Sequence, residues 1–181
     1  YAQEQRLQSL TDVAHVLAVR PGGYFENAYG WLPVIAEQGV MADSVAPDAP
    51  LPMVATRDVG AAAAAALRSR DWTGFAVREL LGPRHLTFAQ VARKIGAAIG
   101  QPALPYRQIP QDDVRAALEA AGWSPDATRL QVELNRVFSD GSVAARATRT
   151  PASTTPTRFE DYAAADLAPA FAALAPTFSD R

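Results

Sequence analysis

The chain contains no cysteine among its 181 residues. This absence excludes a disulfide bond, a thiolate metal site and a cysteine nucleophile. Histidine is almost as scarce, because only His15 and His85 are present. His15 lies in a strand pattern, where we expect a packed or edge side chain, and His85 lies in a turn after Gly-Pro-Arg, where we expect exposure to solvent. With no cysteine and two separated histidines, we expect no transition-metal site.

An excess of positive charge is also lacking. The chain has 17 basic and 19 acidic residues, which gives a formal net charge of −2. All basic residues except Lys94 are arginines, and they are scattered singly among the acids. Nucleic-acid-binding proteins usually carry a basic stripe, so we expect no nucleic-acid partner.

Long hydrophobic runs are missing as well. The longest, residues 61–67, is far too short to cross a bilayer, and no signal-like stretch opens the chain. We therefore expect no membrane partner and a cytoplasmic location. What is present is ordinary for a globular protein: 49% of the residues are hydrophobic and 20% are charged, in a chain long enough for one domain with a core.

Hydrophobic patterns typical of strands alternate with patterns typical of helices. The first strand pattern is a continuous apolar run, which suits a strand buried on both faces of a parallel sheet. The expected strands are residues 15–20, 53–55, 75–81 and 106–109. The first expected helical segment begins after residue 23 and ends at about residue 37. The other expected helices span residues 59–68, 88–99, 114–121, 125–138 and 158–167. Such alternation predicts the α/β fold class.

Several helix ends carry their own sequence signals, namely side chains that cap helices, prolines that start them and glycines that end them. The expected N-terminal caps are Thr56 or Asp58, the capping boxes of Thr87 with Gln90 and Thr157 with Glu160, and Ser124 before Pro125. Gly39 is expected to end the first helical segment, and Pro33 to kink or restart it. Residues 42–52 and 139–156 are expected to be loops.

The best candidate for a functional site is residues 20–27, Arg-Pro-Gly-Gly-Tyr-Phe-Glu-Asn, where a strand is followed by a helix. In open parallel sheets, ligands bind beyond the carboxyl ends of the strands. Gly22 and Gly23 would let the backbone approach a ligand closely, and the new helix offers free N–H groups. The alternative is a turn whose glycines only satisfy the geometry of the chain, and the residues alone do not separate the two interpretations.

Short motifs follow one another along nearly the whole chain. They are Arg-Pro with Tyr-Phe-Glu-Asn in residues 20–27, Met-Val-Ala-Thr-Arg-Asp-Val-Gly in 53–60, Glu-Leu-Leu-Gly-Pro-Arg in 79–84, Leu-Thr-Phe-Ala-Gln-Val-Ala in 86–92, and Thr-Pro-Thr with Phe in 155–159. Their order and spacing resemble the C-terminal part of NmrA-like proteins, an atypical branch of the short-chain dehydrogenase/reductase family. The resemblance implies the last part of a Rossmann-like, doubly wound parallel sheet with a smaller, mostly helical substrate region. Residues 1–60 would end the NAD(P)-binding domain, and residues 61–181 would form the substrate or partner region, packed intimately on it.

The resemblance also implies which residues contact ligands. The residues expected at the nicotinamide end of NADP or NAD are Pro21, Gly22, Gly23, Tyr24, Phe25 and Glu26. Asn27 and Trp31 would face the pocket of a small-molecule substrate. No catalytic residue is assigned.

One departure from the family pattern is clear, because the G-x-x-G-x-x-G loop does not occur in these residues. The chain also begins at Tyr1 without an initiator Met. We therefore expect a fragment that binds NAD(P) weakly or not at all by itself and that self-associates through an exposed strand edge. The parent would reduce a small carbonyl or quinone. The alternatives are an NAD(P)-sensing regulator that binds a protein partner without turnover, and a freestanding α/β module.

Overall fold

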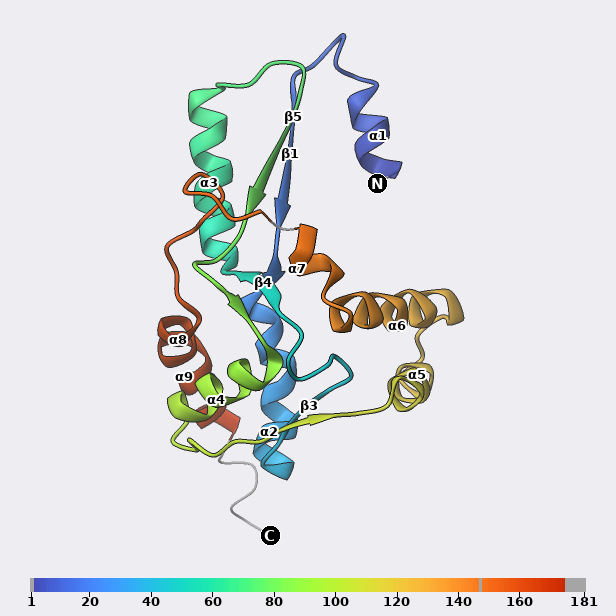
Figure 1. The fold of residues 1–181 in the computed structure, drawn as a ribbon, viewed down its shortest axis with the longest axis vertical. Helices are drawn as coiled ribbons and strands as arrows, with labels where there is room; N and C mark the ends of the chain where they lie inside the picture. The colour runs from blue at the N-terminus through green and yellow to red at the C-terminus, as the bar shows by residue number, and fades with distance from the viewer. Residues whose placement is uncertain (1, 147, 175–181) are drawn as a thin grey trace.

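The computed structural model describes residues 2–146 and 148–174, in which helices and strands alternate along the chain (Figure 1). The predicted α/β class is confirmed. The strands are β1 (Val16–Pro21), β2 (Gly23–Tyr24), β3 (Met41–Asp43), β4 (Leu51–Val54), β5 (Phe75–Leu80), β6 (His85–Leu86) and β7 (Tyr106–Gln108). The helices are α1 (Ala2–Gln8), η1 (Phe25–Trp31), α2 (Leu32–Gln38), α3 (Thr56–Ser69), α4 (Phe88–Ala98), α5 (Gln111–Ala120), α6 (Pro125–Ser139), α7 (Ser142–Arg146), α8 (Phe159–Tyr162), η2 (Ala163–Leu167) and α9 (Ala168–Leu174).

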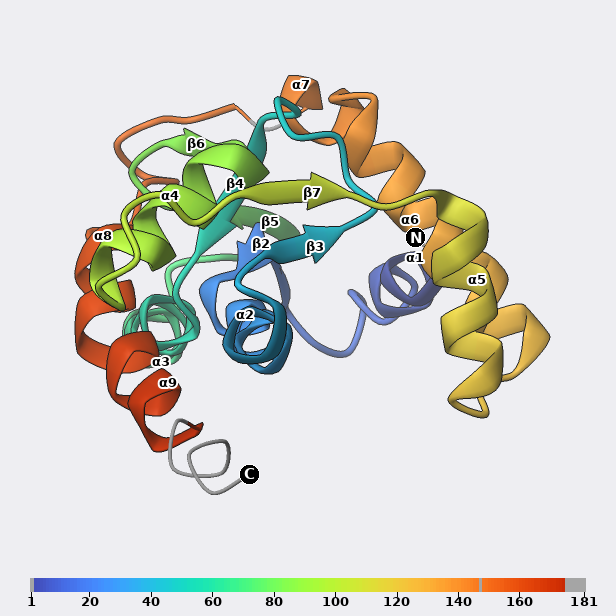
Figure 2. The ribbon, with the colours of Figure 1, turned by 90° about the horizontal axis from the view of Figure 1, so that it is seen from below.

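Within the described residues, the strands form three small sheets. β1 and β5 run parallel, with Val16 opposite Phe75 and Pro21 opposite Leu80. β4 lies between β2, which is parallel to it, and β6, which is antiparallel. β3 and β7 form a second parallel pair, seen side by side in Figure 2. The parallel pairs are of the kind that an α/β sheet contains.

The first strand is where expected but is less buried than expected. Residues 16–19 of β1 are half-buried and Arg20 is exposed, so the prediction of a strand covered on both faces is wrong. The reason is that a strand is buried only where helices or sheets cover both of its faces. In the part of the chain that the structure describes, β1 has β5 as its single strand neighbour.

The helices gather in two groups around α2. Both views show α5 and α6 together on one side and α4, α8 and α9 on the other (Figure 1, Figure 2). None of the helices in residues 2–146 and 148–174 is long and apolar enough to span a membrane. Short elements were missed by the sequence analysis: β3 falls in the expected loop at residues 42–52, and α7 falls in the expected loop at residues 139–156.

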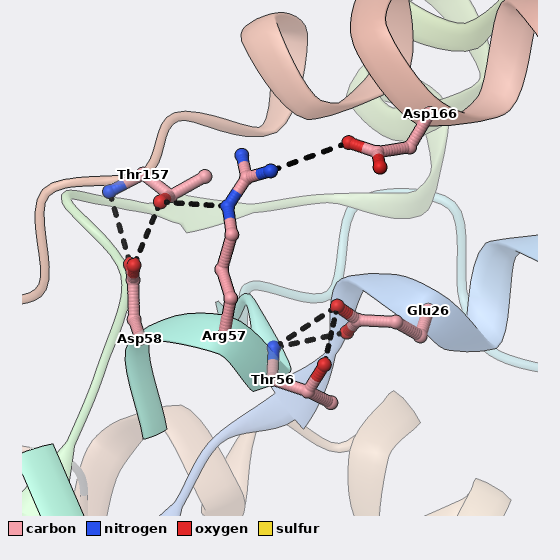
Figure 3. A network of polar contacts seen from close by, with 6 residues as sticks. All are labelled: Glu26, Thr56, Arg57, Asp58, Thr157 and Asp166. Carbon is pink, nitrogen blue, oxygen red and sulfur yellow. Dashed lines mark hydrogen bonds and ion pairs between the residues drawn. The ribbon is translucent and has the colours of Figure 1, made fainter. Parts of the chain in front are cut away.

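The N-terminus of α3 is capped by a side chain from another element. Its N-cap residue, Ala55, has no polar side chain, so neither Thr56 nor Asp58 acts as the expected cap. Instead the carboxylate of Glu26, on η1, accepts hydrogen bonds from the Thr56 N–H at 3.0 and 3.1 Å and from the Thr56 hydroxyl at 2.7 Å (Figure 3). An acidic group is favourable here because free N–H groups and the helix dipole make a helix N-terminus positive.

The same turn of α3 holds the C-terminal segment of the described chain. Asp58 accepts hydrogen bonds from the N–H of Thr157 at 3.0 Å and from its hydroxyl at 2.8 Å (Figure 3). Arg57 reaches Asp166 at 3.4 Å. The expected capping box at Thr157 is therefore wrong: the N-cap of α8 is Arg158, because the Thr157 hydroxyl is already bonded to Asp58.

Other local signals are confirmed. Gly39 ends α2 with a φ of 64°, in the left-handed region that glycine tolerates best. Thr87 and Gln90 form both halves of the capping box of α4. Ser124 caps α6, whose first residue is Pro125. These signals lie within a few residues of the helix end that they set, so the local sequence suffices to predict them.

One hydrophobic core joins the early and late parts of the chain. Its largest fully buried side chains include Phe25, Leu32 and Met41 from the first 60 residues, and Ile95 and Phe159 from the rest. The core therefore crosses the expected boundary near residue 60. The division of the chain into a nucleotide-binding part and a substrate part stays a prediction.

Candidate functional site

The segment predicted to carry the site begins at the carboxyl end of β1. Pro21 ends that strand, Gly23 and Tyr24 form β2, and Phe25 begins η1. The expected strand-to-helix turn thus contains a second, two-residue strand, in which Gly23 pairs with Met53 of β4 and Tyr24 with Val54. The strands β1 and β2, each of which has a parallel partner, both end within the predicted segment. In open α/β sheets, ligands bind at the carboxyl ends of the strands.

The two glycines of the segment have different roles. A Cβ atom on Gly22 would overlap the carbonyl oxygen of Pro52 and lie 2.9 Å from the carbonyl carbon. A Cβ atom on Gly23 would meet its nearest neighbour, the same oxygen, at 3.7 Å, an ordinary contact. Gly22 is therefore required by close packing on β4, which supports the purely geometric interpretation there. Gly23 has no such constraint and leaves open backbone at the surface.

Two adjoining hollows lie beside this segment, with volumes of about 420 and 360 Å³. Pockets for small molecules usually span roughly 300–1,000 Å³. The two hollows share Gly23, Tyr24, Asn27, Pro52 and Phe138 among their lining residues, and we call the joined space the Tyr24 cleft. Its size suits a small planar ligand or one end of a dinucleotide.

Six of the eight predicted ligand-contacting residues line this cleft. Pro21 and Gly22 line only the larger hollow, Trp31 lines only the smaller one, and Gly23, Tyr24 and Asn27 line both. Tyr24 is 37% exposed, which leaves its ring accessible to a ligand. The structure thus brings these residues together, while their binding of a cofactor or substrate stays a prediction.

The other two predicted residues point elsewhere. Phe25 is 1% exposed, and its ring centroid lies 5.0 Å from that of Phe159 and 5.5 Å from that of Tyr162. Glu26 directs its carboxylate to the N-terminus of α3. We therefore correct both assignments: the Phe25 side chain is part of the core and Glu26 is a helix cap, because each already has partners that hold it away from the cleft.

Helix α6 supplies cleft residues that the sequence analysis missed. Gln131, Leu134, Asn135 and Phe138 line the smaller hollow, and Phe138 also lines the larger one. Residues three or four apart lie on one face of a helix, so their spacing shows that they share a face. Nothing in the spacing shows that this face meets residues 23–31.

A chain of half-buried and buried polar groups runs through the lining of the smaller hollow. Gln131 donates from Nε2 to Oδ1 of Asn135 at 2.9 Å, and Asn135 donates from Nδ2 to Oγ of Ser44 at 2.8 Å. The neighbouring carboxylate of Asp43 accepts from Nε1 of Trp31 at 3.0 Å and from the N–H of Ser44 at 2.7 Å. These bonds hold the side chains in single orientations, as a binding site requires.

Tyr106, on β7, is half-buried beside β3. Its hydroxyl donates to the backbone oxygen of Asp43 at 3.1 Å and to that of Val45. Burial, together with the negative charge of Asp43, raises the pKa of Tyr106 above its usual value. Tyr106 therefore stays protonated and supports the β3 segment, and no lining residue is assigned as a general acid or base.

A third hollow, of about 600 Å³, lies between β6, α4 and α8. Its rim is charged, with Arg84, Arg93 and Lys94 around Glu160. Arg84 lies 2.7 Å from the Glu160 carboxylate and Lys94 lies 3.3 Å from it. This hollow contains none of the residues at the carboxyl ends of β1 and β2, so we place the candidate site in the Tyr24 cleft.

His85 also lines the charged hollow and is not the exposed turn residue that the sequence predicted. It lies in β6, half-buried, and its Nε2 atom is shielded from solvent and has no hydrogen-bond partner among the described residues. Burial, and to a lesser degree the charge of Arg149, lowers the pKa of His85. Within residues 2–146 and 148–174, no group of three or more His, Asp or Glu side chains is placed to hold a metal ion.

Glu160 gives a testable dependence of stability on pH. Burial alone would raise the pKa of its carboxyl group, but hydrogen bonds from its own backbone, Arg158 and Arg84, with the charge of Lys94, lower it to about 2 from 4.5. A lowered folded-state pKa stabilises the fold above pH 4.5, and this contribution is lost as the pH falls through about 2. We expect Glu160→Gln to lower the free energy of unfolding at pH 7 and to approach the parent protein in acid, as measured by urea denaturation at several pH values. An equal deficit at every pH would contradict this expectation.

Comparison with curated proteins finds a similar sequence, and no family model matches the chain. The relative is a (4-alkanoyl-5-oxo-2,5-dihydrofuran-3-yl)methyl phosphate reductase from Streptomyces griseus subsp. griseus. It is 33% identical over 102 residues, which cover 56% of this chain and 35% of the relative. The chain thus matches about a third of the length of that protein.

Solved structures match over more of the chain. A nucleoside-diphosphate-sugar epimerase from Staphylococcus aureus has a TM-score of 0.71 at 15% identity, over 91% of this chain and 57% of its own. An NADPH-dependent quinone oxidoreductase from Escherichia coli, complexed with NADPH, has a TM-score of 0.69 at 23% identity, over 88% of this chain and 56% of its own. NmrA, a negative transcriptional regulator in complex with NADP, has a TM-score of 0.63 at 18% identity, over 94% of this chain and 57% of its own.

These similarities confirm the resemblance at the level of the fold. The chain has the α/β fold of NmrA-like, atypical short-chain dehydrogenase/reductase proteins, over somewhat more than half of their length. Because fold alone does not establish activity, function has to be argued from the site.

Proposed function

We propose that this chain is part of an NAD(P)-binding, NmrA-like protein that reduces a small carbonyl compound or quinone in the Tyr24 cleft. The observation that carries the proposal is the meeting of six predicted ligand-contacting residues around one cleft at the carboxyl ends of β1 and β2. Ligands of open α/β sheets bind at this edge. When bound, the cofactor supplies the hydride, and the protein orients the two reactants.

The residues present fit the nicotinamide end of the cofactor. Gly23 leaves backbone open to close approach, Tyr24 offers an exposed aromatic face, and Asn27 offers an exposed amide to a polar edge. The pyrophosphate of the cofactor is normally bound by a glycine-rich loop, and these residues contain no G-x-x-G-x-x-G loop. The proposal therefore assigns only the nicotinamide end to this chain, and weak or absent binding of NAD(P)H by these residues alone is part of it.

The relatives support hydride transfer as the reaction. The curated relative is a reductase by its name, and the Escherichia coli structure is a quinone oxidoreductase complexed with NADPH. The similarity to NmrA, a regulator in complex with NADP, supports a second candidate, an NAD(P) sensor that binds a protein partner without turnover. Both candidates place the nicotinamide in the same cleft, so a measurement of turnover separates them.

The test uses the longest natural polypeptide that carries this chain. We expect steady NADPH oxidation with quinones or aldehydes, and we expect Tyr24→Ala to lower kcat/KM about fivefold or more, because one good aromatic contact contributes about 1 kcal/mol. Trp123→Ala is the matched control, since Trp123 is exposed on the turn between α5 and α6 and lies outside the cleft lining. Tight NADPH binding without turnover would favour the sensor. If the protein showed no NADPH binding and no turnover, both candidates would be refuted.

A further inference from the structure

We propose that the Tyr24 cleft selects an uncharged, planar ligand and that Gln131 is the residue that positions its oxygen-bearing edge. The inference deepens the proposed function, on which it rests for the identity of the cleft as the substrate site. It names a substrate class, neutral quinones and similar flat conjugated carbonyl compounds, and a specificity-determining side chain that the family resemblance did not assign.

The shape of the cleft favours a flat ligand. Aromatic side chains from four separate segments line the smaller hollow: Tyr24, Trp31, Phe88 and Phe138. The rings of Trp31 and Phe88 meet edge to face with centroids 5.3 Å apart, which fixes both. Aromatic walls of this kind give a planar ring a large contact area, since rings prefer stacked or edge-on neighbours.

The charge of the lining disfavours an anion. Among the described residues that line the smaller hollow, Asp43 is the one charged group, and it is negative. The larger hollow contains Arg20, but this side chain is held by Glu4, with 2.9 Å between Nε and Oε1, and Glu79 lines the same hollow. A phosphate or carboxylate would therefore meet negative charge without a free cation to balance it, and such mismatches exclude the wrong ligands.

Gln131 is prepared to bind a neutral oxygen. Ser44 is fully buried, and its carbonyl oxygen accepts from the side-chain amides of Gln108 at 3.2 Å and Gln111 at 3.3 Å. The Ser44 hydroxyl then orients Asn135, which in turn orients Gln131. A side chain held by such a relay gives up little conformational freedom when it binds a ligand.

The free groups of Gln131 match both forms of a reducible carbonyl. A glutamine amide has two donor hydrogens and an acceptor oxygen. One hydrogen is used by Asn135, and among the described residues the second hydrogen and Oε1 have no hydrogen-bond partner. Reduction of a carbonyl adds a hydride and a proton and converts an acceptor oxygen into a hydroxyl that also donates. The Gln131 amide can donate to the first and accept from the second.

The test compares 1,4-naphthoquinone with its 2-sulfonate, which has the same rings and one negative charge. Calorimetric titration gives the Kd of each for the protein. We expect the neutral quinone to bind about tenfold tighter or more, and Gln131→Leu to weaken its binding roughly three- to tenfold, the range expected for one hydrogen bond. In turnover, the same variant should raise the KM for the quinone and leave the KM for NADPH unchanged.

Two further variants of α6 make the result specific. Gln131→Glu keeps the size of the side chain and adds negative charge, so it should weaken quinone binding and weaken sulfonate binding further. Glu133→Gln makes the opposite exchange two residues away on the exposed face, where Glu133 pairs with Arg129, and should change neither Kd. Equal affinity for the two ligands, no detectable binding of the quinone, or unchanged binding by both Gln131 variants would overturn the inference. The expected binding pattern without NADPH oxidation would refute only the proposed reductase, whereas turnover that ignores Gln131 would refute only the inference.

Discussion

Replacing Phe25 by alanine is expected to lower the free energy of unfolding by about 3–5 kcal/mol, the usual range for removing a buried phenylalanine ring. The Phe25 ring is 1% exposed and packs against Phe159 and Tyr162. Its loss would leave a cavity where η1 meets α8, two segments that join the early and late parts of the chain. The free energy of unfolding of a native protein is only about 5–15 kcal/mol, so the change should be plain in a urea denaturation curve.

Tyr24→Ala is the matched control, since it removes the adjacent aromatic ring. Tyr24 is 37% exposed and lines the cleft, so we expect its loss to change the free energy of unfolding by less than about 1 kcal/mol. The two variants should thus separate stability from ligand binding within one dipeptide. If Phe25→Ala unfolded no more easily than Tyr24→Ala, the assignment of Phe25 to the core would be wrong.

The helix ends show which parts of the fold can be predicted from the sequence. The capping box of Thr87 and Gln90 spans four residues, so both partners stand in one short motif. The cap of α3 joins Glu26 to Thr56, 30 residues later, and Asp58 bonds to Thr157, 99 residues later. Such contacts exist only after the chain has folded, and no local pattern identifies the partner.

The site shows the same division. The strand end and the glycines of residues 20–27 mark this segment as a candidate site in the sequence, but the residues alone do not distinguish a ligand site from a purely geometric turn. Which of its side chains face the cleft depends on the pairing of β2 with β4, since successive residues of a strand point to opposite faces. Tyr24 faces outward, whereas the next residue, Phe25, which begins η1, is buried in the core. The contribution of α6 depends on the bond between Asn135 and Ser44, which are 91 residues apart.

A second large effect is expected for Gly22→Ala. The new Cβ atom would overlap the Pro52 carbonyl oxygen and lie 2.9 Å from its carbonyl carbon. Both obstacles are backbone atoms of β4, so no side-chain rotation relieves the overlap, and the strand itself has to move. Overpacking of this kind lowers the free energy of unfolding by about 1–3 kcal/mol. Displacement of Pro52, which lines both hollows, should also weaken ligand binding in the Tyr24 cleft.

Gly23→Ala tests whether this effect comes from the overlap or from a general need for glycine in the segment. Its Cβ would lie 3.7 Å from the same oxygen, and Gly23 does not have a positive φ. Alanine should therefore be tolerated, with a change in the free energy of unfolding within about 0.5 kcal/mol. The two variants are compared by urea denaturation and by quinone titration. Equal destabilisation by both would show that the approach of residue 22 to Pro52 is not what fixes this glycine, whereas loss of binding in Gly23→Ala with full stability would indicate a ligand seated directly on the Gly23 backbone.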